Sequence, residues 1–190
     1  MADRRTAILD AALELVGTLG MRGLTHRAVD AAAGLPPGST SNYFRTREAL
    51  VLGIVERFVV REREMATGPR DEVEPTADGL ATAFGRFVDR ALGPDRAVTL
   101  ARYAILVETA QNPDLLREGR ASGADQVDTW ALDLVTRAGS RDPARDLGVL
   151  ANYVTGMLLH ELALPSPDLD ARARIRTVID TLGWRGPDRP

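Results

Sequence analysis

The sequence contains no cysteine, and this absence removes several kinds of chemistry at once. Disulfide frameworks, thiolate metal sites and cysteine nucleophiles are excluded, and the composition is compatible with a reducing cytoplasm. Lysine is absent as well, so all 24 basic residues are arginine. We interpret this as the codon bias of a GC-rich genome rather than as selection for bidentate phosphate contacts.

Long uninterrupted apolar runs are also missing. The first residues lead directly into an amphipathic pattern that contains Asp10 and Glu14, which is unlike an export signal. The most apolar stretch, residues 147–164, is interrupted by Asn152 and Glu161, so it predicts a buried helix at an interface rather than a membrane span. We therefore expect a soluble, cytoplasmic protein without a membrane partner.

Alternating strand patterns are absent, and apolar residues recur at helical spacing along most of the chain. With 44% hydrophobic residues among 190, the sequence predicts an all-α fold with a substantial core. The net charge of −3 argues weakly against a surface that binds nucleic acid everywhere, although a DNA reader needs only a local basic face. Residues 1–50 are only slightly basic, so charge alone does not identify a DNA-binding domain.

Helix start and stop signals divide the first 50 residues into three helices. Thr25 can cap the second helix, and Gly34 can end it because glycine tolerates positive φ. Pro37 suits the first position of the third helix, where its missing N–H would have been unpaired anyway. Two short helices across a tight glycine-containing turn are the elements of a helix-turn-helix. The three predicted helices are 4–19, 25–33 and 39–44.

A connector helix over 47–66 follows, with Thr46 as its cap. Gly68 and Pro69 then break the helical pattern, so we expect a domain boundary there. This divides the chain into a DNA-binding domain, 1–50, and a larger helical domain, 67–190. Further helices are predicted over 76–92, 95–111, 113–138, 142–164 and 168–182.

Three segments, GLTHRAV at 23–29, AGLPPGSTSNYF at 33–44 and RTREAL at 45–50, form a specific pattern. It resembles the N-terminal signature of the tetracycline-repressor (TetR) family of transcriptional regulators. The shared features are a Thr that starts helix 2, an Ala-Gly turn, a Pro-Gly entry to helix 3, a Tyr-Phe exit and a basic-Glu-Ala-Leu start to helix 4. The match covers about residues 5–55.

The resemblance implies a one-component regulator whose N-terminal three-helix domain binds double-stranded operator DNA. The C-terminal helical domain would then form a homodimer and bind a small-molecule effector, usually to release a repressor from a pseudo-palindromic operator. Two departures from the family pattern stand out. Pro36 replaces a small capping residue, so helix 3 loses its side-chain N-cap. Thr40 and Ser41 replace bulky residues, which predicts a small, hydroxyl-rich recognition surface.

A recognition helix enters the major groove with its N-terminal part nearest the base edges, while flanking groups hold phosphates. The resemblance implies phosphate contacts for Thr25, Tyr43 and Arg47, whereas chemistry and position suggest His26 and Arg27. Alternatively, Tyr43 packs beside Phe44, and we favour both roles for it. The candidates for base reading are Gly38, Ser39, Ser41 and Asn42, although Ser39 could merely cap and Asn42 could be a solvated polar residue.

Ligand sites between bundle helices are mostly apolar with a few polar groups. Tyr153, Met157 and His160 share one face by helical spacing, although such a stripe is more often plain core. Arg102 could bind an anionic group or form a salt bridge with a carboxylate such as Glu108. The candidate ligand residues are Phe84, Phe87, Arg102, Tyr103, Trp130, Tyr153, Met157 and His160.

The last two long helices each carry an apolar stripe that could build a four-helix dimer interface across a twofold axis. The candidate interface residues are Leu147, Leu150, Val154 and Leu158, with Ile175, Val178, Ile179 and Leu182.

No pattern in the sequence indicates catalysis, a cofactor or a metal. His160-Glu161 lacks the second histidine of a zinc-protease helix, and neither a phosphate-binding glycine loop nor a GxSxG elbow is present. Two alternatives stay open beside the regulator. A helical enzyme or carrier would leave the 23–50 signature unexplained. A helical adaptor that has lost DNA binding is conceivable because the basic charge is weak and Pro36 removes a cap.

Overall fold

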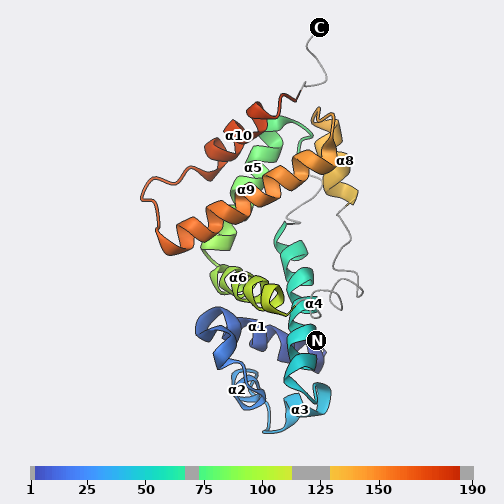
Figure 1. Ribbon diagram of the computed structural model, residues 1–190, viewed down its shortest axis with the longest axis vertical. Coiled ribbons are helices and arrows are strands. Elements are labelled where there is room, and N and C mark those ends of the chain that lie inside the picture. The colour runs from blue at the N-terminus through green and yellow to red at the C-terminus, as the bar shows by residue number, and fades with distance from the viewer. Residues whose placement is uncertain (1–2, 67–72, 113–128, 185–190) are drawn as a thin grey trace. The chain divides into compact units, whose positions relative to one another are not determined.

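The computed structural model describes residues 3–66, 73–112 and 129–184, and within these ranges the secondary structure is entirely helical. The all-α prediction is confirmed. Figure 1 labels the helices, whose bounds are α1 Arg4–Gly23, α2 His26–Ala32, α3 Ser39–Tyr43, α4 Arg47–Ala66, α5 Ala77–Leu92, α6 Arg96–Gln111, α8 Thr129–Arg137, α9 Pro143–Ala163 and α10 Ala171–Thr181.

The capping residues expected from the sequence begin several of these helices. The hydroxyl of Thr25 accepts a hydrogen bond from the Ala28 N–H at 3.1 Å, and Thr46 accepts one from the Ala49 N–H at 3.1 Å. Gly20 adopts φ 69° within α1, so the helix predicted to end at Leu19 is interrupted there and then adds a short further turn. The predicted helix 113–138 is described only over α8, and its earlier part lies outside the described residues.

The chain separates into two compact units, and the first contains α1, α2, α3, most of α4, and α6. Its core contains Leu9, Leu13, Leu50 and Ile54, all of which are almost completely buried. Helices α1 and α4 are joined by Arg57, whose guanidinium binds the carboxylate of Asp10 at 2.7 Å and 3.0 Å. The first unit thus holds the helix-turn-helix on a rigid base. Leu24, Val29 and Phe44 are buried in the same core.

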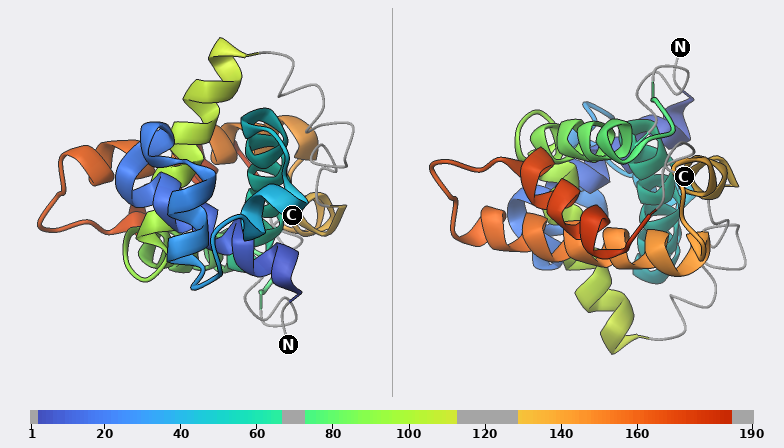
Figure 2. Two further views of the ribbon diagram at one scale, coloured as in Figure 1. Left: turned by 90° about the horizontal axis from the view of Figure 1, so that it is seen from below. Right: turned by 90° about the horizontal axis from the view of Figure 1, so that it is seen from above.

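Helix α6 packs closely on α1 at Gly17, where a Cβ would collide with the main chain of Ala97. The two helices lie side by side in Figure 1 and in the left view of Figure 2. The absence of a side chain at Gly17 therefore allows the close approach of the two helix backbones.

The second unit contains α5, α8, α9 and α10. Helix α5 packs against both α9 and α10, and the right view of Figure 2 shows these three helices together. Leu80, Leu150, Leu158, Ile175 and Ile179 are at most 1% exposed and form the centre of this core. Among the described residues, one face of α9 stays exposed, and it is formed by Val149, Asn152, Gly156, Leu159 and Ala163.

Polar contacts fix the two ends of α9. Near its start, the carboxylate of Asp146 accepts hydrogen bonds from the Ser140 hydroxyl at 2.6 Å and from the Trp184 indole N–H at 2.7 Å. Near its end, the carboxylate of Glu161 accepts from the Ser166 main-chain N–H at 2.7 Å and binds Arg174 at 3.0 Å. These contacts position α9 against α10.

Candidate nucleic-acid interface and ligand groove

The turn before α3 brings an acidic side chain of α2 to the start of α3. The Asp30 carboxylate accepts hydrogen bonds from the main-chain N–H groups of Gly38 and Thr40, each at 2.7 Å. The Thr40 hydroxyl donates to the same carboxylate at 2.6 Å. Helix α3 therefore has a side-chain cap that comes from the preceding helix, although its own N-cap residue, Gly38 at φ 89°, cannot supply one.

Sequence reasoning missed Asp30. The loss of a cap at Pro36 was predicted, but the group that replaces it was not. The signal in the sequence was an aspartate directly after the apolar Val29. The departures at Pro36 and Thr40 are connected through Asp30, because Asp30 caps the helix and binds the Thr40 hydroxyl.

The Asp30 carboxyl is ionised under ordinary conditions although it is only 4% exposed. The hydrogen bond from the Thr40 hydroxyl lowers the pKa of Asp30 most, and the N–H groups of Thr40 and Gly38 and the nearby His26 lower it further. Burial acts in the opposite direction and is outweighed.

Thr40 does not belong to the recognition surface, which corrects the expectation of a hydroxyl-rich face at Thr40 and Ser41. Its side chain is completely buried because its hydroxyl turns inward to Asp30. Ser41 and Asn42 are exposed, and Tyr43 is 45% exposed. Ser39 is half-buried, with its hydroxyl donating to the Pro36 carbonyl at 2.6 Å. The free polar surface of α3 is thus narrower than the sequence suggested.

The residues predicted to bind phosphate differ in their exposure and in their hydrogen bonds within the domain. Thr25 and Arg27 are exposed at the start of α2. His26 is half-buried, and its Nε2 lies 2.7 Å from the Phe44 carbonyl oxygen. That oxygen can only accept, so Nε2 donates the hydrogen bond and links α2 to the end of α3.

Arg47 serves an internal contact as well. Its guanidinium donates to the main-chain oxygens of Leu24 at 2.9 Å and Met21 at 3.0 Å. These bonds fasten the start of α4 to the end of α1. A phosphate contact by Arg47 remains a prediction. Its guanidinium would have to bind the phosphate while it also donates to the Leu24 and Met21 oxygens.

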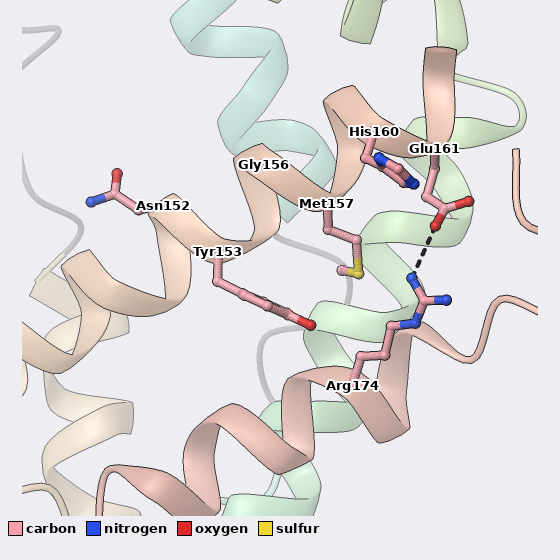
Figure 3. Close-up of a pocket in the computed structure, with 7 residues that line it drawn as sticks. All are labelled: Asn152, Tyr153, Gly156, Met157, His160, Glu161 and Arg174. Atoms are coloured by element: carbon pink, nitrogen blue, oxygen red, sulfur yellow. Dashed lines mark hydrogen bonds and ion pairs between the residues drawn. The ribbon is translucent and has the colours of Figure 1, made fainter. Parts of the chain in front are cut away.

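In the second unit, a groove of about 290 Å³ lies along α9 and α10. It brings together three predicted ligand residues, Tyr153, Met157 and His160. Figure 3 shows the Tyr153 ring and the Met157 side chain reaching toward α10, while Glu161 and Arg174 are paired at one end. The other lining residues are Asn152, Gly156, Glu161 and Arg174.

The other predicted ligand residues are not among those that line this groove. Phe84 and Phe87 are half-buried on α5 in the same unit. Arg102 and Tyr103 are half-buried on α6, which belongs to the first unit, and burial lowers the pKa of the Arg102 guanidinium. The side chain of Trp130 lies outside the described residues.

The residues predicted for the dimer interface need correction, because the chain itself buries most of them. Leu150, Val154, Leu158, Ile175 and Ile179 are at most 4% exposed within the second unit. Their side chains therefore have no free surface to offer a second copy. Leu147, Val178 and Leu182 are half-buried.

Across the described ranges, no helix is long and apolar enough to cross a membrane. The same ranges contain no group of three or more His, Asp or Glu side chains arranged to hold a metal ion.

Comparison with known proteins agrees with this architecture over both units. Residues 8–54 match the family model described as bacterial regulatory proteins, tetR family, and residues 75–183 match the tetracyclin repressor-like C-terminal domain. The HTH-type transcriptional regulator CymR of Pseudomonas putida is 26% identical over 177 residues, which cover 90% of this chain and 85% of that protein.

Solved structures show the same relationship. The multidrug binding protein EbrR, in complex with ethidium, is 29% identical with a TM-score of 0.68, covering 95% of this chain and 98% of EbrR. A TetR-family member from Streptomyces coelicolor A3 is 27% identical with a TM-score of 0.70, covering 95% of this chain and 98% of that one. This chain therefore belongs to the TetR family of transcriptional regulators, which are not enzymes.

Proposed function

We propose that the protein is a ligand-responsive repressor that binds a pseudo-palindromic operator as a homodimer. The observation that carries DNA binding is the presentation of α3. Its inner face is fixed to Asp30 through Thr40, whereas Ser41 and Asn42 are exposed on the outside. An Asn side chain can bond adenine with both of its amide groups, and a Ser hydroxyl can donate or accept.

Phosphate contacts would hold the domain in register on the duplex. We assign this role to Thr25, Arg27 and Tyr43, whose side chains are exposed around the helix-turn-helix. His26 and Arg47 would assist mainly by holding the helices, because both bind main-chain oxygens. We keep 1–50 as the DNA-binding domain, and 67–190 as the domain for ligand binding and dimerisation.

The adaptor alternative depended on the weak basic charge and on the missing cap at Pro36. The second argument loses its force, because Asp30 caps α3 from the preceding helix. Electrophoretic mobility shift with the DNA upstream of the protein's own gene tests the choice. A retarded complex that specific competitor displaces and random competitor does not supports the regulator, while no complex at low salt would support the adaptor.

For the dimer we propose the uncovered face of α9, in place of the buried residues. Val149, Asn152, Gly156, Leu159 and Ala163 follow helical spacing and are all exposed. Val149 is 38% exposed and Leu159 51% exposed, so this face offers apolar surface that a second copy could cover. A dimer also matches an operator whose half-sites lie about 34–36 Å apart or a multiple of that.

Leu159→Arg tests this interface, with Thr136→Arg on the exposed side of α8 as a control. Sedimentation at micromolar concentration should show a dimer for the wild type and Thr136→Arg but a monomer for Leu159→Arg. A monomeric wild type, or a Leu159→Arg variant that stays dimeric, would contradict the assignment.

The effector is proposed to be a mostly apolar small molecule. EbrR was crystallised with ethidium, proflavin and malachite green, all of which carry aromatic rings. In this chain the groove at Tyr153, Met157 and His160 offers an aromatic ring, a polarisable thioether and an imidazole. Binding lowers operator affinity only if the ligand prefers the conformation that fits DNA poorly, and couplings of about 1–3 kcal/mol would weaken binding about 5–150-fold.

A titration with ethidium and proflavin, followed by intrinsic tryptophan fluorescence and by operator release, tests this role. Quenching and release over the same concentration range would support it. Quenching without release would leave ligand binding but no regulation, and a broad compound screen with neither would contradict the effector proposal.

A further inference from the structure

Helix α3 begins without any capping group of its own. The first N–H groups of a helix have no partner inside the helix and need an acceptor from elsewhere. The N-cap residue is Gly38, which has no side chain and so gives the helix no side-chain cap of its own. Helix α3 is also only five residues long, which is too short to be stable through its own hydrogen bonds.

The carboxylate of Asp30, on α2, supplies the missing hydrogen-bond acceptors. Its Oδ2 accepts from the Gly38 N–H at 2.7 Å, and its Oδ1 accepts from both the N–H and the hydroxyl of Thr40, at 2.7 Å and 2.6 Å. A buried carboxylate is costly unless its oxygens are hydrogen-bonded, and here both oxygens are. The negative charge also lies at the positive end of α3, where it is favoured.

We propose that Asp30 is the positioning residue of the recognition helix. It fixes where α3 begins and how the helix is rotated, and so determines how Ser41 and Asn42 reach the base edges. This role rests on the proposed DNA binding. Asp30 itself does not contact DNA, because its side chain is only 4% exposed and its two oxygens are used within the domain.

Charge and positioning predict opposite effects for Asp30→Asn. Removing a negative charge from a DNA-binding domain should strengthen binding to any duplex, because phosphate attraction dominates non-specific affinity. Loss of positioning should instead weaken binding to the operator while leaving random DNA unaffected or bound more tightly. The ratio of the two affinities therefore separates the positioning role from a general electrostatic or stability effect.

The experiment uses the full chain and an operator selected by the wild type from random double-stranded DNA. Affinities for this operator and for a scrambled duplex of the same length are measured at one salt concentration. We expect Asp30→Asn to reduce the operator-to-scrambled ratio at least about tenfold, the effect of about 1.4 kcal/mol. Glu14→Gln removes the same charge from an exposed site on α1 and should leave the ratio unchanged.

Thr40 provides a second and milder pair of variants if Asp30→Asn fails to fold. Thr40→Val removes the hydroxyl bond to Asp30 with little change in volume and should lower the ratio several-fold. Thr40→Ser keeps the hydroxyl and should retain the wild-type ratio. Equal losses for Thr40→Ser and Thr40→Val would overturn the proposal, as would a folded Asp30→Asn variant that discriminates like the wild type.

Hydrogen exchange of the free protein gives a readout that does not depend on DNA. In Asp30→Asn the amides of Gly38 and Thr40 should exchange at least about tenfold faster than the loss of global stability alone explains. The amide of Leu13 in the core of α1 reports that global loss. Unchanged rates at Gly38 and Thr40 would overturn the proposal. If the wild type selects no operator, DNA binding itself fails, and the exchange rates alone decide whether Asp30 holds α3.

Discussion

The Arg47 guanidinium donates a hydrogen bond of 2.9 Å to the main-chain oxygen of Leu24, at the junction between α1 and α2. A second bond of 3.0 Å reaches the oxygen of Met21. Replacing Arg47 with Met should leave these carbonyls without their charged donor and lower the free energy of unfolding by about 1–3 kcal/mol. Urea denaturation measures the change. The exposed neighbour Arg45 is the matched control, and an equal loss in Arg45→Met would contradict a specific role for Arg47.

Tyr43 and Asn42 should affect DNA binding in different ways. Tyr43 is 45% exposed at the end of α3, so its hydroxyl is available to a phosphate. Tyr43→Phe should weaken binding to all sequences and reduce the salt slope by at most about one unit, whereas Asn42→Ala should change base preference. A salt titration and a base-substitution series on the operator provide the two measurements. Variants that both behave like the wild type would remove α3 from the interface.

The Asp30 carboxyl should make the domain sensitive to acid. Because the folded state lowers the pKa of Asp30, mainly through the Thr40 hydroxyl, its stabilisation is complete above the ordinary aspartate pKa of about 3.9. It is lost as the pH falls through the lower pKa of the folded state. Wild type should therefore unfold at higher urea than Asp30→Asn at pH 7, and the difference should shrink steadily toward pH 2. A constant difference would contradict the assignment.

Gly17 should tolerate no larger residue. A Cβ there would collide with the main chain of Ala97 on α6, and neither backbone can move without repacking. Gly17→Ala should therefore cost about 1–3 kcal/mol despite the better helix propensity of alanine. Gly148 on α9 is the control, because a Cβ there meets nothing within 4 Å, and Gly148→Ala should stabilise by about 0.5–1 kcal/mol. Thermal unfolding that shows the same sign for both variants would refute this account.

Trp184 should contribute to stability through Asp146, to which its indole N–H donates at 2.7 Å. Trp184→Phe removes a hydrogen bond to a buried carboxylate, and we expect a loss of about 1.5–3 kcal/mol. This loss also matters for ligand titrations, because the variant isolates the fluorescence of Trp130 but starts from a weaker fold. Ser140→Ala removes the other donor to Asp146 and should give a comparable loss. If Trp184→Phe unfolds at the same free energy as the wild type, water replaces the indole N–H as the donor to Asp146 without loss of stability.

The sequence predicted local features of this protein well, because they depend on neighbouring residues. Thr25 and Thr46 cap their helices as expected, and Gly20 interrupts α1 where the first helix was predicted to stop. The helix-turn-helix was recognisable because its signals lie within a few residues of one another. Hydrophobic spacing also identified Leu158 and Ile175 as members of apolar stripes.

The sequence pattern does not show which helix or which chain covers each apolar side chain. An apolar stripe indicates burial but does not say whether the cover comes from the same chain, so Leu158 was assigned to a partner although α5 and α10 belong to the core that buries it. The contact between Asp30 and Thr40 spans two helices and follows no helical period, so spacing alone does not reveal it. The same holds for the association of α6 with α1.

The capping of α3 by Asp30 has a consequence for engineering new operator specificity. Exchanging only α3 for a helix that carries a bulky apolar side chain at position 40 would remove the Thr40 hydroxyl. Asp30 would then keep its charge inside the domain but lose the hydroxyl that binds it. A successful transplant must therefore move α2 and α3 together, with residues 30 and 40 taken from the same donor, so that the smallest exchangeable reading module is the helix pair and not the recognition helix alone.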